Sequence, residues 1–403
     1  MTSEGVVIIG AGECGVRTAF ALREHGYNEP ISLIGAEQYP PYERPPLSKS
    51  CQTGLTEITP MSSYEAAGVD LRLNATVNAI DPTRREVILS LGGTLRYDKL
   101  VIATGARARK LSNLVGHQLR TFDDAKSLMP TICDGSRLVI VGAGLIGLEL
   151  AATARSAGAT VTIVGRADRI MKRSVPEPIA DYMTAKHEAE GVWFILGVPI
   201  ANCSDTVVEL TDGTRLEADK VVVAIGSVPN TEIAADANLT INNGIAVDGM
   251  FRTSDRHIFA AGDCCSFPFR GERIRLENWR AARDQAEHIA SVICGSDQPY
   301  EGTPWFWSDQ YDYGIQIAGV HDNQRPLVRR DLTGGGFIVF QIDENGILNY
   351  AGGVGKGAEI GKDIRISEKL IKRGIVVKHH DLANPRLDLK ALLKAKMPAK
   401  AGA

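Results

Sequence analysis

The sequence carries the pattern Gly-X-Gly-X-X-Gly twice, and each copy follows directly on a short run of apolar, mostly β-branched residues. These runs are residues 6–9 and 138–141. A helix-like stretch and a second apolar run, residues 31–34 or 160–164, follow each loop. The loop glycines are Gly10, Gly12, Gly15, Gly142, Gly144 and Gly147. Each copy therefore predicts a strand–helix–strand unit, with its glycine loop between the first strand and the helix.

A loop of this kind has a specific use for each glycine. The first permits a tight turn, the second lets the backbone approach a pyrophosphate, and the third lets helix and strand pack closely. The N-terminus of the following helix offers free N–H groups and a partial positive charge to the phosphates. One loop alone is also compatible with a merely tight turn. Two loops, each in the expected strand–helix context, predict two bound dinucleotides.

The similarity between the two halves extends beyond the loops. Residues 97–105, which end with Thr104 and Gly105, resemble residues 218–226, which end at Gly226. In both segments an apolar run leads into the terminal glycine. Self-similarity over whole supersecondary units predicts two domains of related fold.

The chain changes character from about residue 311. Aromatic and β-branched residues alternate there, and a helix-like run follows at residues 367–373. This pattern predicts a separate α+β domain. Residues 390–403 are rich in Lys and Ala with little to bury, so we expect a flexible tail.

Composition narrows the function classes. Hydrophobic residues make up 44% of the chain, and the net charge of -3 arises from 45 basic and 48 acidic side chains. A sizeable core is therefore expected, and neither nucleic acid nor an anionic membrane is an expected partner. No apolar run reaches the roughly 18 residues of a membrane span, and no charged leader precedes residue 6, which favours the cytoplasm. The seven cysteines form no CxxC pair and predict no metal site.

A further turn follows the apolar run 258–261 and contains Gly262 and Asp263. A carboxylate at such a strand end would bond a ribityl hydroxyl. With the glycine loops, the set resembles flavoprotein reductases that bind two dinucleotides. Across nearly the whole chain the sequence resembles the ferredoxin reductases of bacterial oxygenase and cytochrome P450 systems. The segments that carry this resemblance are residues 41–49, 102–107, 262–263, 277–279 and 304–310.

The resemblance implies an α/β fold with two Rossmann-like domains and a C-terminal α+β domain. It implies an FAD domain built from residues 1–107 and 232–310, an NAD(P)H domain at 108–231, and a C-terminal domain at 311–403. It also implies hydride transfer from NAD(P)H to FAD, followed by single-electron transfers to a [2Fe-2S] ferredoxin. That ferredoxin would feed a Rieske oxygenase or a P450. A homodimer stays open.

The same resemblance suggests residues for the flavin site. Lys49 would place its ammonium near flavin N5, where it favours negative charge on the reduced ring. A lysine in such a place needs a carboxylate, and Glu149 matches the family's partner. Trp307 matches a flavin-contacting position, and Trp279 offers a second aromatic surface.

Two arginines are candidates for the FAD pyrophosphate, because a guanidinium can bond two phosphate oxygens at once. They are Arg44 and Arg107, with Arg109 as the alternative to the second.

The sequence departs from the usual pattern where a dinucleotide fold holds its adenosine ribose. An Asp or Glu normally ends the second strand, but here both strands end in glycine. On the flavin side Glu37 follows two residues later and would serve. On the nicotinamide side Arg166 follows the glycine and would pair with a 2′-phosphate. Both NADH and NADPH therefore stay open as electron donors.

The main alternative is an enzyme whose cysteine joins the chemistry, such as an NAD(P)H oxidase, a peroxidase or a coenzyme A disulfide reductase. Cys51 lies two residues after Lys49 and would be that cysteine. A basic docking surface for the acidic ferredoxin is also expected. Its candidates are Arg283, Arg329, Arg330, Lys369, Lys372 and Arg373.

Overall fold

The first glycine loop joins a buried parallel strand to a helix, as the sequence predicts. A computed structural model describes residues 4–50 and 54–394 of the chain. The described residues form two compact units. Unit 1 takes those of segments 1–45, 54–107 and 227–301, and unit 2 takes those of segments 46–53, 108–226 and 302–403.

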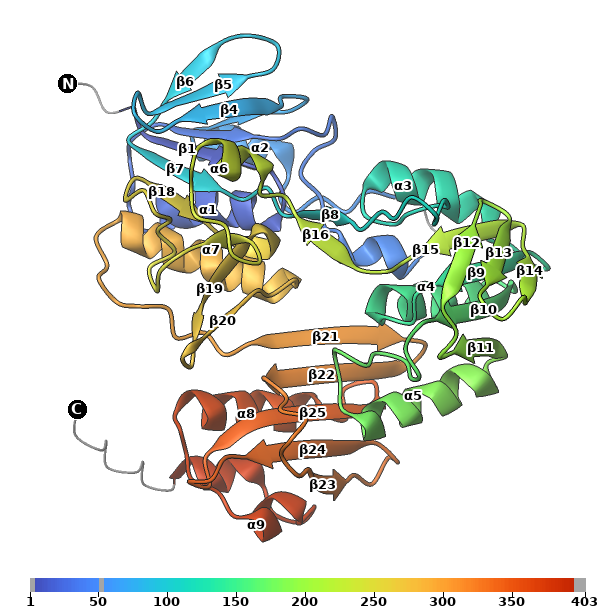
Figure 1. The fold of residues 1–403 in the computed structure, drawn as a ribbon. Helices are drawn as coiled ribbons and strands as arrows, with labels where there is room; N and C mark the ends of the chain where they lie inside the picture. The colour runs from blue at the N-terminus through green and yellow to red at the C-terminus, as the bar shows by residue number, and fades with distance from the viewer. Residues whose placement is uncertain (1–3, 51–53, 395–403) are drawn as a thin grey trace. The chain divides into compact units, whose positions relative to one another are not determined.

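Unit 1 is built on a five-stranded parallel sheet in the order β18-β7-β1-β2-β3. Figure 1 labels β18, β7 and β1 of this sheet. Its strands are β1 (Val6–Ile9), β2 (Ile31–Ile34), β3 (Val69–Arg72), β7 (Lys99–Ile102) and β18 (Ile258–Ala260). Helix α1 (Glu13–Glu24) follows the first glycine loop and packs against α7 (Trp279–Ile293). Asn278 caps α7 by accepting a hydrogen bond from the Ala281 N–H.

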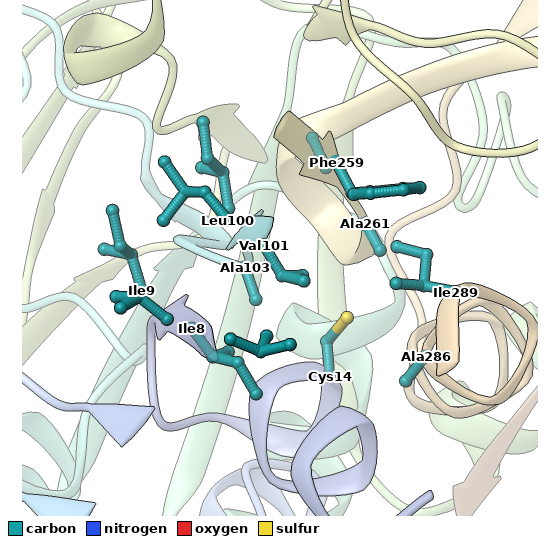
Figure 2. Packing of buried hydrophobic residues seen from close by; sticks show 14 of the residues in the cluster. Ile8, Ile9, Cys14, Leu100, Val101, Ala103, Phe259, Ala261, Ala286 and Ile289 are labelled. Carbon is teal, nitrogen blue, oxygen red and sulfur yellow. The ribbon is translucent and has the colours of Figure 1, made fainter. Parts of the chain in front are cut away.

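The core of unit 1 covers both faces of this sheet, and the two helices pack against one of them. Figure 2 shows side chains of β1, β7 and β18 gathered around Cys14 of α1 and around Ala286 and Ile289 of α7. Ile8 and Leu100 are fully buried, and each such side chain stabilises the fold by roughly 1.5–3 kcal/mol. The core therefore holds the first glycine loop at the carboxyl edge of the sheet.

Smaller elements complete unit 1. They are an antiparallel sheet of β4 (Val77–Asp81), β5 (Glu86–Leu89) and β6 (Thr94–Arg96), a sheet of β17 (Ile245–Ala246), β19 (Cys265–Phe269) and β20 (Glu272–Ile274), and the helices α2 (Met61–Ala66), η3 (Gly262–Cys264) and α6 (Glu232–Asp236). A two-stranded ribbon pairs β8 (Ala106–Ala108) with β16 (Ser227–Pro229).

Unit 2 repeats the parallel arrangement. Its sheet has the order β11-β10-β9-β15, and the order β3-β2-β1-β7 in unit 1 corresponds to it strand for strand. The strands are β9 (Arg137–Val141), β10 (Thr160–Gly165), β11 (Val192–Leu196) and β15 (Lys220–Val223). Its helices are α3 (Phe122–Leu128), η2 (Met129–Thr131), α4 (Leu145–Ser156) and α5 (Glu177–Ala189). A small sheet joins β12 (Ile200–Cys203), β13 (Val207–Leu210) and β14 (Arg215–Glu217). The predicted repeat is confirmed.

The rest of unit 2 is an antiparallel sheet in the order β21-β22-β25-β24-β23, with helices beside it. Its elements are β21 (Trp305–Gln310), β22 (Tyr313–Gly319), β23 (Val328–Asp331), β24 (Phe337–Ile342), β25 (Leu348–Lys356), α8 (Gly361–Lys372), α9 (His379–Ala383) and η4 (Leu389–Lys394). Two parallel Rossmann-like regions and a C-terminal α+β region confirm the predicted fold class.

The predicted division into three domains stays a prediction. Strand β21, which our boundaries assign to the FAD domain, pairs with β22 in the C-terminal sheet. In the predicted tail, η4 begins at the buried Leu389, and the positions from 395 onward lie outside the described residues. Among the residues that the structure describes, every helix is too short or too polar to cross a membrane.

Candidate functional site

The first glycine loop of unit 1 has the geometry that a dinucleotide requires. Gly10 has φ +110°, and a Cβ built there would lie 2.2 Å from the carbonyl oxygen of Ala103. A Cβ on Gly15 would lie 1.9 Å from the carbonyl oxygen of Gly10, so helix and strand approach too closely for any side chain. At Gly12 no atom beyond the adjoining residues lies within 4 Å of the added Cβ. The second glycine therefore faces open space, where a pyrophosphate would approach the backbone.

The second loop, in unit 2, repeats this geometry. Gly142 has φ +118°, and its added Cβ would lie 2.3 Å from the carbonyl oxygen of Ala224. The added Cβ of Gly147 would lie 2.3 Å from the carbonyl oxygen of Gly142. No atom lies within 4 Å of the Cβ added to Gly144. Both loops thus combine two closed glycine positions with one open position, and both fit a dinucleotide.

The first loop also contains Glu13, the first residue of α1, which the sequence did not indicate as a site residue. Its side chain is 12% exposed, and its Oε1 lies 3.6 Å from the Nε of Arg283. Oε2 is buried, with no hydrogen-bond partner among the described residues. Burial raises the pKa of Glu13 to about 7, against the lowering effect of Arg283. The first loop therefore contains a buried carboxyl group that Arg283 neutralises only in part, close to where the pyrophosphate of a dinucleotide would bind.

Two predicted flavin contacts of unit 1 lie together. Arg44 donates from Nη2 to the Oε1 of Glu37 at 2.7 Å, and the Tyr42 hydroxyl donates to Oε2 of the same carboxylate at 2.5 Å. Burial lowers the pKa of the Arg44 guanidinium, but Tyr42 and Glu37 outweigh burial and raise the net pKa. Glu37 and Tyr42 thus hold the Arg44 guanidinium in place in this loop. The ribose and pyrophosphate roles of the two residues stay predictions.

Thr104 and Gly105 are hydrogen-bonded to Asn230, which ends the segment that begins at Gly226. The Thr104 hydroxyl donates to the carbonyl oxygen of Asn230 at 2.7 Å, and the Asn230 amide donates back to the Thr104 carbonyl at 2.8 Å. Gly105 has φ +65°. The predicted pyrophosphate ligand Arg107 donates to Oδ1 of Asn230 and forms an ion pair of 2.6 Å with Glu232. Both contacts leave further N–H donors of this half-exposed guanidinium free for a phosphate.

The turn after β18 also forms as predicted. Gly262 has φ +75°, and its N–H donates to the buried amide oxygen of Gln285 at 2.7 Å. Asp263 follows it in η3. The Arg283 guanidinium lies 4.8 Å from the ring centre of Trp279 at the start of α7. Gly262, Asp263 and Trp279 thus belong to unit 1 together with the first loop.

In unit 2, Gly165 ends β10 at the position where a dinucleotide fold normally carries an Asp or Glu. Gly165 packs closely, since an added Cβ would lie 3.2 Å from Leu196 and 3.5 Å from Ala143 of the second loop. Arg166 follows it and is exposed. Gly226, at the end of the segment after β15, has φ +103°.

Lys49, Glu149 and Trp307 meet within unit 2. The Nζ of Lys49 lies 3.9 Å from Oε1 of Glu149, as the predicted pair requires. A shorter ion pair of 2.7 Å joins Lys49 to Asp309, and the indole N–H of Trp307 donates to the same carboxylate oxygen at 3.0 Å. The Lys49 Nζ also lies 5.2 Å from the Trp307 ring centre. Asp309 is therefore a second carboxylate at this site.

Two serines hold the carboxylate of Glu149. The Ser48 hydroxyl donates to Oε2, and the Ser308 hydroxyl donates to Oε1, each at 2.6 Å. Burial raises the pKa of Glu149, while Lys49 and the two serines oppose that effect. Lys49, Glu149 and Asp309 line a pocket of about 500 Å³ with Tyr311. This cluster of charges is called the Lys49 site below.

One docking candidate is wrong. Arg330 is 2% exposed and donates to the carbonyl oxygens of Leu382 and Leu387, with Asp363 at 3.7 Å. The residues that bury Arg330 lie more than fifty positions later in the chain, so the sequence around Arg330 does not indicate its burial. Arg329 pairs with Asp331 at 2.8 Å. The remaining candidates stay predictions, and Lys369, Lys372 and Arg373 are exposed.

The cysteine alternative is not decided by the structure, because Cys51 lies outside the described residues. Six other cysteines, all outside the masked segments, are free thiols. No group of three metal-ligating side chains occurs within residues 4–50 and 54–394.

Two dinucleotide cradles, one in each parallel sheet, and a separate site with a lysine, carboxylates and an indole define the class of a two-nucleotide oxidoreductase. The family model described as pyridine nucleotide-disulphide oxidoreductase matches residues 4–286, and the model described as reductase C-terminal matches residues 305–393. The chain belongs to the pyridine nucleotide-disulphide oxidoreductase family. Membership implies FAD and a pyridine nucleotide as cofactors.

Similar proteins cover the chain almost end to end. The ferredoxin–NAD(+) reductase component of the anthranilate 1,2-dioxygenase system of Burkholderia cepacia is 38% identical over 98% of this chain and 100% of its own. The ferredoxin reductase for the CYP199A2 system of Rhodopseudomonas palustris has a TM-score of 0.90 at 35% identity, covering 96% of this chain and 99% of that one. A covalent putidaredoxin reductase–putidaredoxin complex has a TM-score of 0.90 at 33% identity, covering 96% and 98%.

Proposed function

We propose that this chain is an FAD-dependent NAD(P)H:ferredoxin reductase that supplies electrons to a Rieske oxygenase or a cytochrome P450. The observation that carries the proposal is the pair of glycine loops, each closed at its first and third glycine and open at its second. Two such loops support two dinucleotides, and the similarity to ferredoxin reductases over nearly the full length supports the [2Fe-2S] acceptor. Because the donor belongs to the cellular pyridine nucleotide pool, we also propose a cytoplasmic location.

The residues of the two units divide the work in this proposal. The first loop would hold the FAD pyrophosphate with Arg44, and Glu37 and Asp263 would bond its hydroxyl groups. The second loop would hold the pyridine nucleotide. When bound, FAD accepts a hydride and releases its electrons one at a time. Lys49 would stabilise the negative charge that develops on the reduced ring, and Trp307 would exclude water from it.

Anaerobic titration of the purified holoprotein tests this function. We expect a yellow protein that NADH or NADPH bleaches, and whose colour returns on addition of an oxidised [2Fe-2S] ferredoxin. FAD should remain with the protein through gel filtration, because the first loop would hold its pyrophosphate by backbone contacts. A colourless protein that takes up no FAD would contradict the proposal. Bleaching by NAD(P)H without electron transfer to any ferredoxin would show that a ferredoxin is not the electron acceptor.

The choice between NADH and NADPH depends on Arg166. Since a glycine stands where a carboxylate would repel a 2′-phosphate, Arg166→Glu should lower kcat/KM for NADPH at least about tenfold, roughly the strength of one charge-assisted hydrogen bond. The same variant measured with NADH is the internal control, and its kcat/KM should change by less. Steady-state dye reduction with both donors gives the ratio. An equal loss with the two donors would show that Arg166 does not read the 2′-phosphate.

A further inference from the structure

A line of hydrogen bonds runs through unit 2 and ends on Glu149. The Tyr311 hydroxyl lies 3.1 Å from the Nδ1 of His187. The Nε2 of His187 lies 2.8 Å from the amide oxygen of Gln310. The amide nitrogen of Gln310 donates to the Ser308 hydroxyl oxygen at 3.1 Å, and Ser308 donates to Glu149 at 2.6 Å. The line joins α5, β21 and α4.

Tyr311 is half-buried, whereas the other members of this line are buried and have few alternative partners. His187 and Ser308 are fully buried, and Gln310 is 1% exposed. The ring of Phe194 on β11 packs edge-on against His187 at 6.1 Å. Burial lowers the pKa of His187, which favours the neutral imidazole with a single N–H.

The amide of Gln310 sets the direction of the whole line. Its nitrogen can only donate, so Ser308 accepts from it and keeps its own hydrogen for Glu149. Its oxygen can only accept, so the His187 hydrogen must sit on Nε2. The Nδ1 of His187 is then an acceptor, and Tyr311 donates to it. Every hydrogen in the line therefore points toward the carboxylate.

We propose that His187 and Gln310 are positioning residues that act through Ser308 to hold Glu149 as a hydrogen-bond acceptor beside Lys49. The charged groups that face Glu149 are Lys49, from the loop after η1 (Pro45–Ser48), and Asp309, from β21. Donors aimed at a carboxylate favour its ionised form, in which Glu149 attracts the Lys49 ammonium alongside Asp309. This inference deepens the proposed function and rests on the role given there to Lys49 and Glu149.

The tautomer of His187 is the first test. In the apoprotein with ¹⁵N-labelled histidine, NMR should show His187 as a neutral imidazole protonated on Nε2, unchanged between about pH 7 and 9. The His187→Gln variant identifies the signal by its loss. An Nδ1–H tautomer, or a titration in this range, would overturn the proposed direction of the line.

The second test measures the carboxyl group itself. Infrared spectra of the apoprotein against pH, with Glu149→Gln to identify the band, give the midpoint at which Glu149 loses its proton. Ser308→Ala should raise this midpoint by about one pH unit, because the carboxylate loses one donor. Gln310→Met should raise it by a smaller but resolved amount, because the Ser308 hydrogen is then no longer directed.

Gln341→Met is the matched control. Gln341 is fully buried on β24 of the same sheet and donates to the carbonyl oxygens of Asp322 and Arg325. We expect it to lower stability as Gln310→Met does and to leave the Glu149 midpoint unchanged. Wild-type midpoints in Ser308→Ala and Gln310→Met would overturn the proposal, and a shift in Ser308→Ala alone would remove the role of Gln310 and His187.

These readouts are independent of the proposed function. Lys49→Met and Glu149→Gln, measured as the rate of flavin reduction in the holoprotein, test whether the Lys49 site serves hydride transfer. Unchanged rates there would contradict the proposed roles while leaving the infrared midpoints as they are. Slower rates together with unshifted midpoints would contradict only the positioning role.

Discussion

Gly12→Ala is expected to leave the apoprotein folded and to remove its capacity for FAD. No atom lies within 4 Å of the added Cβ, and Gly12 has φ −85°, which any residue adopts. The cost to the fold is that of alanine at a helix N-cap, about 1 kcal/mol or less. In the complex, however, the new methyl group would occupy the space of the pyrophosphate. We expect FAD affinity to fall at least about 100-fold, which corresponds to roughly 2.7 kcal/mol.

Gly144→Ala is the matched counterpart in the second loop. Its added Cβ also meets no atom within 4 Å, so this variant should keep its FAD and its yellow colour while losing pyridine nucleotide binding to a similar degree. FAD retention after gel filtration, and the concentration of NAD(P)H that half-saturates the rate of bleaching, measure the two effects. If both variants lost the same ligand, or neither lost any, the assignment of one dinucleotide to each loop would be wrong.

Gly15→Ala separates the open position from a closed one. Its added Cβ would lie 1.9 Å from the backbone oxygen of Gly10, so the loop must move even without ligand. This variant should therefore lose much more apoprotein stability than Gly12→Ala, whose cost to the fold is about 1 kcal/mol or less, and should lose FAD as well. Thermal unfolding of the two apoproteins makes the comparison.

The fold was predictable because its signals are local. The runs that became β1 and β9 end in glycine loops, and the periodic stretches after them became α1 and α4. Repetition of the whole unit supplied the second, independent reason to expect two Rossmann-like regions. The elements whose signals lie within a few consecutive residues were therefore predicted correctly.

The contacts of the Lys49 site are not local, and the sequence showed them less completely. Asp309 makes the shorter ion pair with Lys49 across 260 positions of sequence. The resemblance indicated Glu149 but not this second carboxylate. Arg330 failed for the same reason, since the carbonyl groups that bury it come from α9 and the segment after it. When residues far away in the sequence bury a side chain, the sequence next to that side chain shows no pattern that predicts the burial.

Glu13→Gln is expected to stabilise the apoprotein above pH 7. Burial raises the pKa of Glu13 to about 7 in the folded state, from an ordinary value of 4.5. The folded state therefore holds its proton more tightly than the unfolded state, and the free energy of unfolding falls as pH rises from about 4.5 to about 7. Glutamine imitates the protonated form, so the variant should lack this loss. The difference of about 2.5 pH units corresponds to roughly 3 kcal/mol at pH 8.

Urea unfolding of the two apoproteins at pH 4.5 and pH 8 measures this effect. We expect similar midpoints at the lower pH and a higher midpoint for the variant at pH 8. Glu24→Gln, at the exposed end of the same helix, is the control and should follow the wild type at pH 8 more closely. Ionisation of Glu13 should also weaken the binding of FAD. An ionised Glu13 would repel the FAD pyrophosphate, and this repulsion would be strongest above pH 7. FAD affinity should then decline with pH in the wild type and less so in Glu13→Gln. Parallel pH profiles for the two proteins, in stability and in FAD affinity, would mean that Glu13 is already ionised in the folded state at low pH.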